Sequence, residues 1–600
     1  MLENFLCLPL FLCFSVVEQN TCKKLQIPHI FGDHMVIQRD KPIRMFGSAE
    51  PEATVQVRLA ELNGITKANQ HGTWSLELEA LPANAEGTTL SVTSNSETIE
   101  YQDVIIGDVW ILGGQSNMED ELENVYHGDM EVASANHPNI RLMTIPQEAS
   151  PQPLSNFARI NEYNSWTGRY EQKGGWSRCT PETVHRFSAI GYIFGRRLHL
   201  VSGIPIGLID TAWGGTTMEA WTSRDMLKTV DGARPLLAEW DAKIEDYDAE
   251  ASLQERIDHW KEDTERRKKE GKSPNPKPTE PDQDPASDRN NPGASFNGMI
   301  VPYADFNLRG AIFNQGYNNA LGDARPKLYA RVFKAMIQDW RCVFQNEAMP
   351  FGIISLTAGG NPQIYQNFEI SMIDAGPFIR EGQYKAWQEL ENVGFAPAYD
   401  QQVPWYHPHK KVELGERIAR WALHTQYGQT QLGWQPAICT ELENRGNHLI
   451  LTFDRAVRVH DGRPFEGFAI AGEDQHFYPA KAEFVVVGKD EHGRDRLDQQ
   501  KLKIWSPMVL EPEAVRYAWA RNPIGNAVNS QHHERIIPIP SFRTDNWDWP
   551  EAPFDAAGLD AKNTHNHQLH QMRQQAEVWI KKRIIEEAKE ILKATEGSSK

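Results

Sequence analysis

The sequence predicts an α/β fold in which a doubly wound parallel sheet is flanked by N-terminal and C-terminal β-sandwich-like domains. Nearly continuous apolar runs alternate with helical patterns over residues 104–427, which is typical of parallel strands buried on both faces. Short segments that alternate between apolar and polar residues precede and follow this region, as in antiparallel sheets. At 600 residues the chain is too long for a single hydrophobic core, so we expect several domains.

The start of the chain predicts a signal peptide over residues 1–20. Residues 5–17 form an apolar run with the length of a signal core, too short to span a bilayer. The signal is atypical, because Glu3 rather than a basic residue precedes the run. Cys22 raises the alternative of a lipid anchor, but the residues before it are not small and aliphatic, so we favour cleavage. We therefore expect an exported protein, periplasmic or extracellular.

An N-terminal β-domain is expected over residues 25–103, where alternating segments are separated by Gly, Pro and Asn turns. The pattern changes at residues 104–112, an apolar run that predicts the first strand of an α/β domain covering 104–427. Further runs of this kind, with helical patterns between them, occur at 204–209, 308–313 and 351–356.

Three other segments complete the predicted organisation. A charged and then Pro-rich insertion at about 240–292 indicates an exposed helix and a loop, more typical of a solvated excursion than of a lid. Short alternating segments return in a second β-domain over 428–546. A charged helix is expected over 565–600, and we expect it to pack against the protein or to mediate oligomerisation.

Composition excludes several classes of function. A formal net charge of -19 and a pI near 5.6 work against binding to nucleic acid, which relies on clustered Lys and Arg. No segment after the signal reaches the ~20 apolar residues of a transmembrane helix. The cysteines that follow the signal lack the CxxC or CxxH spacing of metal sites, so we predict no metal and no cofactor.

Ser116 is the candidate nucleophile. It closes the buried strand in Leu-Gly-Gly-Gln-Ser-Asn-Met, at the carboxyl end of the sheet, where α/β folds place ligands. The two glycines allow a sharp turn, and amides at the start of the following helix can donate to an anion. Taken alone, a Ser after Gly-Gln is more often a helix cap or a turn residue.

Three further segments each supply a different component of an acyl-transfer site. Gly215 offers a backbone N–H, Asn319 offers an amide donor, and His407 lies in a loop just before an amphipathic helix. A neutral imidazole at that place can take the Ser116 proton and return it to the leaving alcohol. Singly, Gly215 is as readily a tight turn, Asn319 a cap and His407 a surface histidine.

Residues 107–119, Gly-Asp-Val-Trp-Ile-Leu-Gly-Gly-Gln-Ser-Asn-Met-Glu, resemble the nucleophile block of the sialate O-acetylesterase family in the SGNH hydrolase superfamily. The segment Ile-Pro-Ile-Gly-Leu-Ile-Asp with the Trp-Gly-Gly-Thr that follows is similar to its glycine block. Gln-Gly-Tyr-Asn-Asn at 315–319 is similar to the asparagine block, and His-Pro at His407 to the last block. The resemblance covers most of the chain and implies an SGNH-type sheet.

What the resemblance implies is a secreted serine esterase that hydrolyses acetyl esters of sialic acid or related sugars through an acetyl-enzyme. Ser116 and His407 are the catalytic pair, and the oxyanion hole is formed by the amides of Ser116 and Gly215 with the Asn319 side chain. No metal takes part. Substrate contacts are assigned to Gln115, Asn117, Trp213, Gln315, Tyr317 and Trp405.

Two positions depart from the family pattern. Trp405 stands where the family usually has an Asp two residues before the histidine, so the third member of the triad is open. Asp400 can loop back to the imidazole, or a backbone carbonyl can orient the ring in a Ser–His dyad. Tyr317 stands where a Glu is common, which concerns substrate contacts.

Two alternative functions stay open at the level of the sequence. One is an acetylesterase for a plant or algal polysaccharide, because the flanking domains and the insertion set the substrate while the chemistry is shared. The other is a catalytically weak carbohydrate-binding protein that has lost the triad acid.

Overall fold

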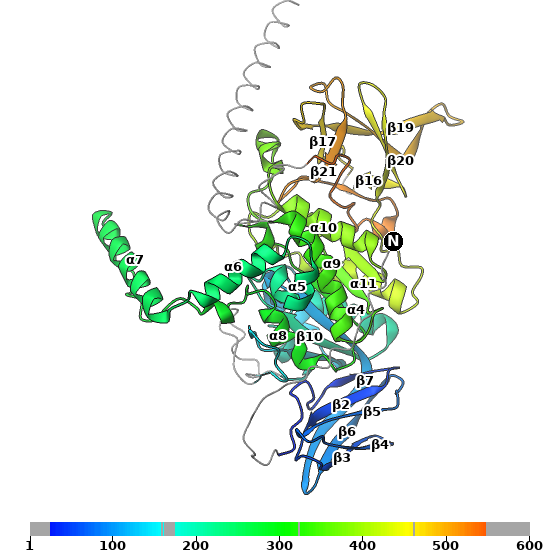
Figure 1. Cartoon of the computed structure of the whole chain (residues 1–600). Coiled ribbons are helices and arrows are strands. Elements are labelled where there is room, and N and C mark those ends of the chain that lie inside the picture. Colours follow the sequence, from blue (N-terminus) through cyan, green and yellow to red (C-terminus); the bar gives the residue numbers. More distant parts are fainter. Residues whose placement is uncertain (1–23, 158–159, 161–174, 322–324, 460–461, 548–600) are drawn as a thin grey trace, which may run out of the picture.

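The computed structural model describes residues 24–157, 160, 175–321, 325–459 and 462–547. Figure 1 shows the N-terminal strands at the bottom, a sheet surrounded by helices in the middle, and the C-terminal strands at the top. The predicted signal peptide and the predicted helix at 565–600 lie outside the described residues.

The sheet in the middle is organised around strand β7 (Glu97–Gly114). Its path is β13-β12-β11-β7-β10-β8-β9, in which neighbouring strands are parallel except for the antiparallel pair β8 and β9. The bounds are β8 (His137–Thr144), β9 (Ser177–Cys179), β10 (Ile206–Ala212), β11 (Gly310–Asn314), β12 (Phe351–Ile354) and β13 (Val393–Ala396). The carboxyl ends of β7, β10 and β11 therefore meet at one edge, which brings the loops that follow them together.

Helices cover both faces of this sheet, because its strands are apolar on both sides. Leu112 and Ile354 belong to the core that contains residues of α4 and α11, whereas Ile111 and Ile353 belong to the core that contains residues of α9 and α10. The long helices are α4 (Ala189–Ser202), α9 (Pro326–Val343), α10 (Gly376–Glu389) and α11 (Lys411–Gln426). The shorter ones are α1 (Ser116–Glu119), α2 (Gly128–Ala133), α3 (Pro181–Val184), α5 (Arg224–Thr229) and α8 (Ala294–Met299). The predicted α/β class, with parallel strands and helices, is confirmed in this form.

Strands β1, β3, β4 and β6 join the same sheet through β7, whereas β2 and β5 form a separate antiparallel pair. Strand β6 pairs antiparallel with β7, and β3 pairs with both β6 and β4. The bounds are β1 (Val36–Gln38), β2 (Ile43–Ser48), β3 (Thr54–Leu59), β4 (Leu62–Lys67), β5 (Thr73–Leu78) and β6 (Asn84–Ser94). Because β7 is continuous, the predicted domain boundary at residue 103 falls inside a strand. The division into domains stays a prediction.

Antiparallel sheets make up the C-terminal part. One sheet has the order β14-β15-β20-β19 and another the order β18-β17-β21-β23, and residues of both lie in one hydrophobic core. The first sheet contains β14 (Cys439–Asn444), β15 (Leu449–Phe453), β19 (Lys481–Lys489) and β20 (Asp495–Trp505). The second contains β17 (Phe468–Ala471), β18 (Tyr478–Pro479), β21 (Ala514–Tyr517) and β23 (Phe542–Arg543), and a separate pair is β16 (Val457–Val459) with β22 (Ala527–Asn529).

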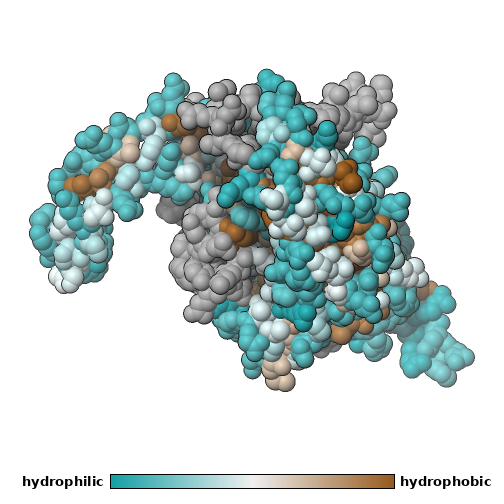
Figure 2. All heavy atoms as spheres, turned by 90° about the horizontal axis from the view of Figure 1, so that it is seen from below, coloured by the Kyte–Doolittle hydropathy of each residue, from teal (hydrophilic) through white to brown (hydrophobic). Residues whose placement is uncertain are grey.

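Where the sequence predicts a charged insertion, a helical arm projects from the body. Helix α6 (Arg234–Glu245) leads into α7 (Ala249–Lys269), and the Pro-rich chain after α7 returns along it. Trp260 Nε1 donates to the Asn275 carbonyl at 2.7 Å and Arg256 Nη1 to the Pro281 carbonyl at 2.9 Å. Figure 2 shows this arm standing clear of the body, mainly hydrophilic with a small hydrophobic strip.

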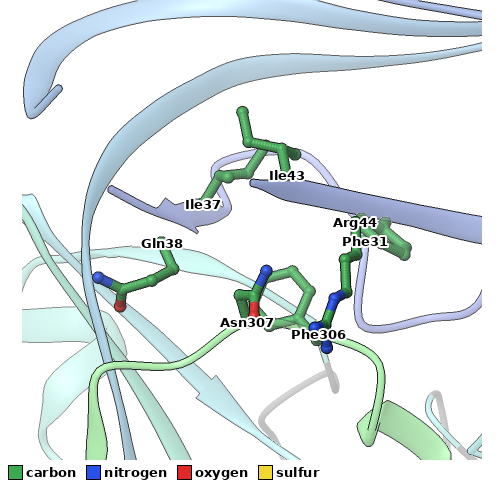
Figure 3. A pocket seen from close by; sticks show the side chains of 7 residues that line it. All are labelled: Phe31, Ile37, Gln38, Ile43, Arg44, Phe306 and Asn307. Atoms are coloured by element: carbon green, nitrogen blue, oxygen red, sulfur yellow. The ribbon is translucent and has the colours of Figure 1, made fainter. Parts of the chain in front are cut away.

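Two further observations narrow the search for a site. Within the described residues, every helix is too short or too polar to cross a membrane. Figure 3 shows a small pocket between the N-terminal strands and the loop before β11, lined by Phe31, Ile37, Gln38, Ile43, Arg44, Phe306 and Asn307. This pocket faces the amino end of β11, whereas Ser116 follows the carboxyl end of β7, so the two lie at opposite edges of the sheet.

Candidate active site

Ser116 is the first residue of α1 and follows directly on the end of β7. The turn between them requires glycine at position 114, where φ is 131° and an added Cβ would lie 2.1 Å from the Asn314 carbonyl oxygen. Ser116 is partly exposed, while Gln115 and Asn117 on either side of it are buried. The first amides of a helix have no acceptor within the helix, so the Ser116 N–H can donate to an oxyanion.

Three buried polar side chains around the serine, the anchor residues Gln115, Asn117 and Glu119, each bind a different loop. Gln115 Oε1 accepts hydrogen bonds from the amides of Gly316 and Asn318, both at 3.2 Å. This holds the loop after β11 against the start of α1. The predicted asparagine segment is thereby attached to the serine segment through side chain and backbone.

Glu119 binds the loop after β10. Its Oε2 accepts the Gly214 amide at 2.8 Å, and its Oε1 accepts Gln147 Nε2 at 2.6 Å. The next residue, Gly215, has φ of 75°, a left-handed conformation that favours glycine. Arg289, from the chain that follows the arm, donates to the Gly214 carbonyl at 3.0 Å. The turn that carries the predicted Gly215 donor is therefore fixed from both sides.

Asn117 binds the loop that carries His407. Its Nδ2 donates to the Tyr406 carbonyl at 3.0 Å, and its Oδ1 accepts a short hydrogen bond from Lys411 Nζ. One bond thus joins the residue after the serine to the residue before the histidine. His407 lies between the two contacts, Tyr406 and Lys411, and so is held against α1.

Asn319 is held by three partners near the glycine turn. Its Oδ1 accepts from the Met218 amide at 2.9 Å and from Gln315 Nε2 at 2.7 Å. Its Nδ2 donates to Glu219 Oε2 at 2.9 Å, which uses one of the two amide hydrogens. The neighbouring Asn318 donates to the Gly215 carbonyl at 2.8 Å. Both asparagines therefore belong to the wall of the site.

Burial lowers the pKa of His407 below its ordinary value of 6.5. The Asp120 carboxylate opposes this effect, while the charges of Lys411 and His409 add to it. The imidazole is consequently neutral at neutral pH, the form that accepts a proton.

Residues 106–233 match the family model described as carbohydrate esterase, sialic acid-specific acetylesterase. The chain is similar to this family over that segment, which includes Ser116 and Gly215. A sialate O-acetylesterase from Rattus norvegicus is 24% identical over 577 residues, which cover 89% of this chain and 97% of the relative. The enzyme of the same name from Homo sapiens is 23% identical and covers 85% of this chain and 91% of the relative.

A solved structure superimposes on most of this chain. The crystal structure of a carbohydrate acetylesterase from Xanthomonas citri superimposes with a TM-score of 0.67 at 27% identity. The match covers 87% of this chain and all of that one. The resemblance predicted from the sequence motifs is therefore confirmed, and the chain is homologous to sialate O-acetylesterases.

Asp400, predicted as one candidate for the third triad member, is engaged elsewhere in the esterase. Its two carboxylate oxygens accept Arg417 Nη1 at 2.8 Å and Arg417 Nη2 at 2.5 Å. Arg417 is only 7% exposed and needs this counter-charge. Asp400 thus fixes its loop to α11, and the charges that act on His407 come from other residues. The geometry does not support the assignment of Asp400 to the triad.

The six residues predicted to contact substrate divide into two groups. Gln115, Asn117 and Gln315 are at most 4% exposed and their amides bind neighbouring loops, so the structure uses them as supports. Tyr317 is also buried, at 5% exposure, and its ring lies 5.4 Å from that of Tyr406. Trp213 is partly exposed and Trp405 is 54% exposed. Only these two tryptophans present an accessible aromatic surface within the predicted set.

Sequence reasoning missed three residues that the structure places at the site: Glu119, Asp120 and Lys411. The two acids follow the serine within one helical turn, a position that favours carboxylates for reasons unrelated to catalysis. Lys411 has no exposed surface, although lysine is almost always exposed unless paired. The sequence does not indicate which of the adjacent Lys410 and Lys411 is buried.

The environment of His407 predicts the acid limb of the pH profile. A general base works when neutral, so activity is full above its pKa and is lost as the pH falls through it. Because burial lowers that pKa, the midpoint of the acid limb should lie below pH 6.5. kcat/KM for an aryl acetate, measured across acidic pH with circular dichroism to verify folding, provides the test. A midpoint above 6.5 would contradict the neutral, buried imidazole.

Proposed function

We propose that this protein is an exported carbohydrate esterase that hydrolyses O-acetyl esters of sialic acid or related sugars, with Ser116 as nucleophile and His407 as general base. The observation that carries the proposal is the attachment of three separate loops to the helix of Ser116. Through Gln115, Asn117 and Glu119, a hydroxyl, an imidazole and a glycine amide gather at one edge of the sheet. Such convergence is what an acyl-transfer site requires.

In the proposed mechanism His407 removes the Ser116 proton as the oxygen attacks the acetyl carbonyl. The tetrahedral oxyanion accepts hydrogen bonds from the amides of Ser116 and Gly215 and from the second amide hydrogen of Asn319. The protonated imidazole then gives its proton to the departing sugar hydroxyl. Water, activated by the same imidazole, releases acetate from the acetyl-enzyme and restores Ser116.

The sugar part of the substrate is supported by the relatives and by an aromatic surface. The rat and human relatives are named sialate O-acetylesterases, and the Xanthomonas citri relative is described as a carbohydrate acetylesterase. Trp405 and Tyr406 are 54% and 49% exposed and precede His407 directly. Their rings lie 5.4 Å apart and are tilted by 36°, a pair of faces on which pyranose rings can stack.

The same aromatic pair favours a second candidate, an acetylesterase for plant or algal polysaccharide. Two exposed rings beside the imidazole provide more stacking surface than a single monosaccharide ring covers. An SGNH-type catalytic sheet, β-sandwich-like flanking domains and export remain parts of the proposal for either substrate.

Replacement of Ser116 by Ala tests the function directly. Loss of the nucleophile should reduce acetate release by at least about a thousandfold, since the remaining groups cannot form an acetyl-enzyme. Acetate released from acetylated sialic acids and from acetylated plant oligosaccharides is the readout, measured side by side. Ser134→Ala, at an exposed position after α2, is the matched control and should retain full activity. Wild-type acetate release no faster than the protein-free blank would favour a sugar-binding protein, and equal release above the blank by Ser116→Ala and wild type would show that Ser116 is not the nucleophile.

Trp405→Ala tests the aromatic surface separately from the chemistry. Loss of one stacking face should raise KM for an acetylated oligosaccharide by about tenfold, while kcat/KM for a small aryl acetate changes by less than about twofold. Trp240→Ala, on the projecting arm, is the control. Equal losses on both substrates would show that Trp405 supports the catalytic loop and does not bind sugar.

A further inference from the structure

The carboxylate of Asp120 lies on the side of α1 that faces the His407 loop. Asp120 follows the last turn of α1, and its amide donates to the Ser116 carbonyl at 2.9 Å. Asn117 and Asp120 are three residues apart and so occupy the same side of the turn. Both contact Lys411, Asn117 through a short hydrogen bond and Asp120 with Oδ2 at 3.6 Å from Nζ.

These contacts enclose His407 between two fixed points of its own loop. Tyr406, just before it, is bound by Asn117, and Lys411, just after it, is bound by Asn117 and Asp120. The segment from 406 to 411 therefore runs along the side of α1 that carries both side chains. The Asp120 carboxylate on this turn is near enough for its charge to act on the imidazole.

Asp120 also has unused capacity to accept a hydrogen bond. Its Oδ2 is buried, and none of the residues that the structure describes donates a hydrogen bond to it. A buried carboxylate oxygen without a donor is unfavourable, so we expect a donor in the working enzyme. An imidazole N–H is such a donor, and Lys411 alone does not meet the need at 3.6 Å.

We propose that Asp120 serves as the positioning carboxylate of the catalytic histidine, accepting a hydrogen bond from the His407 ring while Lys411 holds it in place. The inference rests on the proposed Ser–His function. It gives the triad its third member from the nucleophile's own helix, in place of a residue shortly before the histidine. Asp400 instead forms a bidentate ion pair with Arg417, which fixes its carboxylate toward α11.

The charges that face His407 give the proposal a signature beyond loss of rate. They are Asp120 at the end of α1, Lys411 at the start of α11, and His409 in the same loop. Removing the negative charge should lower the pKa of His407, and removing the positive charge of Lys411 should raise it. A role limited to packing would move neither.

The experiment measures kcat, KM and the pH profile of full-length variants with an aryl acetate. Asp120→Asn should lower kcat by about ten- to a hundredfold with KM nearly unchanged, and should move the acid limb to lower pH. Lys411→Met should move the acid limb in the opposite direction. Asp129→Asn, an exposed carboxylate on α2, is the matched control and should match wild type.

Asp400→Asn completes the comparison. It should lower the thermal midpoint, because Arg417 loses its counter-charge, while the acid limb stays in place. A wild-type kcat and an unmoved limb in Asp120→Asn would overturn the proposal, as would a shifted limb in Asp400→Asn. Neither result would contradict the Ser–His function, which Ser116→Ala tests separately.

Discussion

The site depends on hydrogen bonds from three side chains that flank one serine. Gln115, Asn117 and Glu119 alternate with the proposed nucleophile and the buried Met118, and each binds a loop that follows a different part of the sheet. Parallel strands bring loops to a common edge but do not fix their distances. The anchor residues supply that precision. The motif around Ser116 is therefore the structural centre of the site, and the proposed chemistry takes place on the same motif.

Because the bonded groups are buried, these hydrogen bonds favour one position of each loop. A typical hydrogen bond adds only about 1 kcal/mol to stability, whereas a buried polar group without a partner costs about 1–3 kcal/mol. Asn117, Glu119 and Lys411 are all nearly fully buried, so loop positions that leave them unpaired are strongly disfavoured. Lys411 shows the same balance: burial lowers its pKa to about 8, and Asp120 limits the change. The catalytic loop is held in one arrangement because the alternatives leave charges unpaired.

The sequence predicts local structure well where a pattern has a single physical cause. Apolar runs predicted the strands around residues 104–112 and 308–313, and the glycines before Ser116 predicted a turn that only glycine permits. It was less informative about polar side chains. Gln115 and Asn117 were assigned to substrate, yet both bind protein loops, since the direction of an amide depends on distant segments.

The third triad member shows the same limit. Asp400 is near His407 in the sequence, which makes it a natural candidate, but Arg417 on α11, 17 residues further along the chain, binds its carboxylate. Asp120 is far from His407 in the sequence and close to it only after folding. For the third triad member, proximity along the chain is a weaker guide than the contacts of Lys411. No local sequence pattern indicates that Lys411 is buried.

The most direct measurement of the central claim is the site of covalent labelling by a fluorophosphonate, mapped by mass spectrometry of peptides. The account predicts a single adduct on the peptide that contains Ser116, formed at a rate that falls sharply when His407 is replaced by Ala. Labelling of another serine, or a rate that is independent of His407, would contradict it.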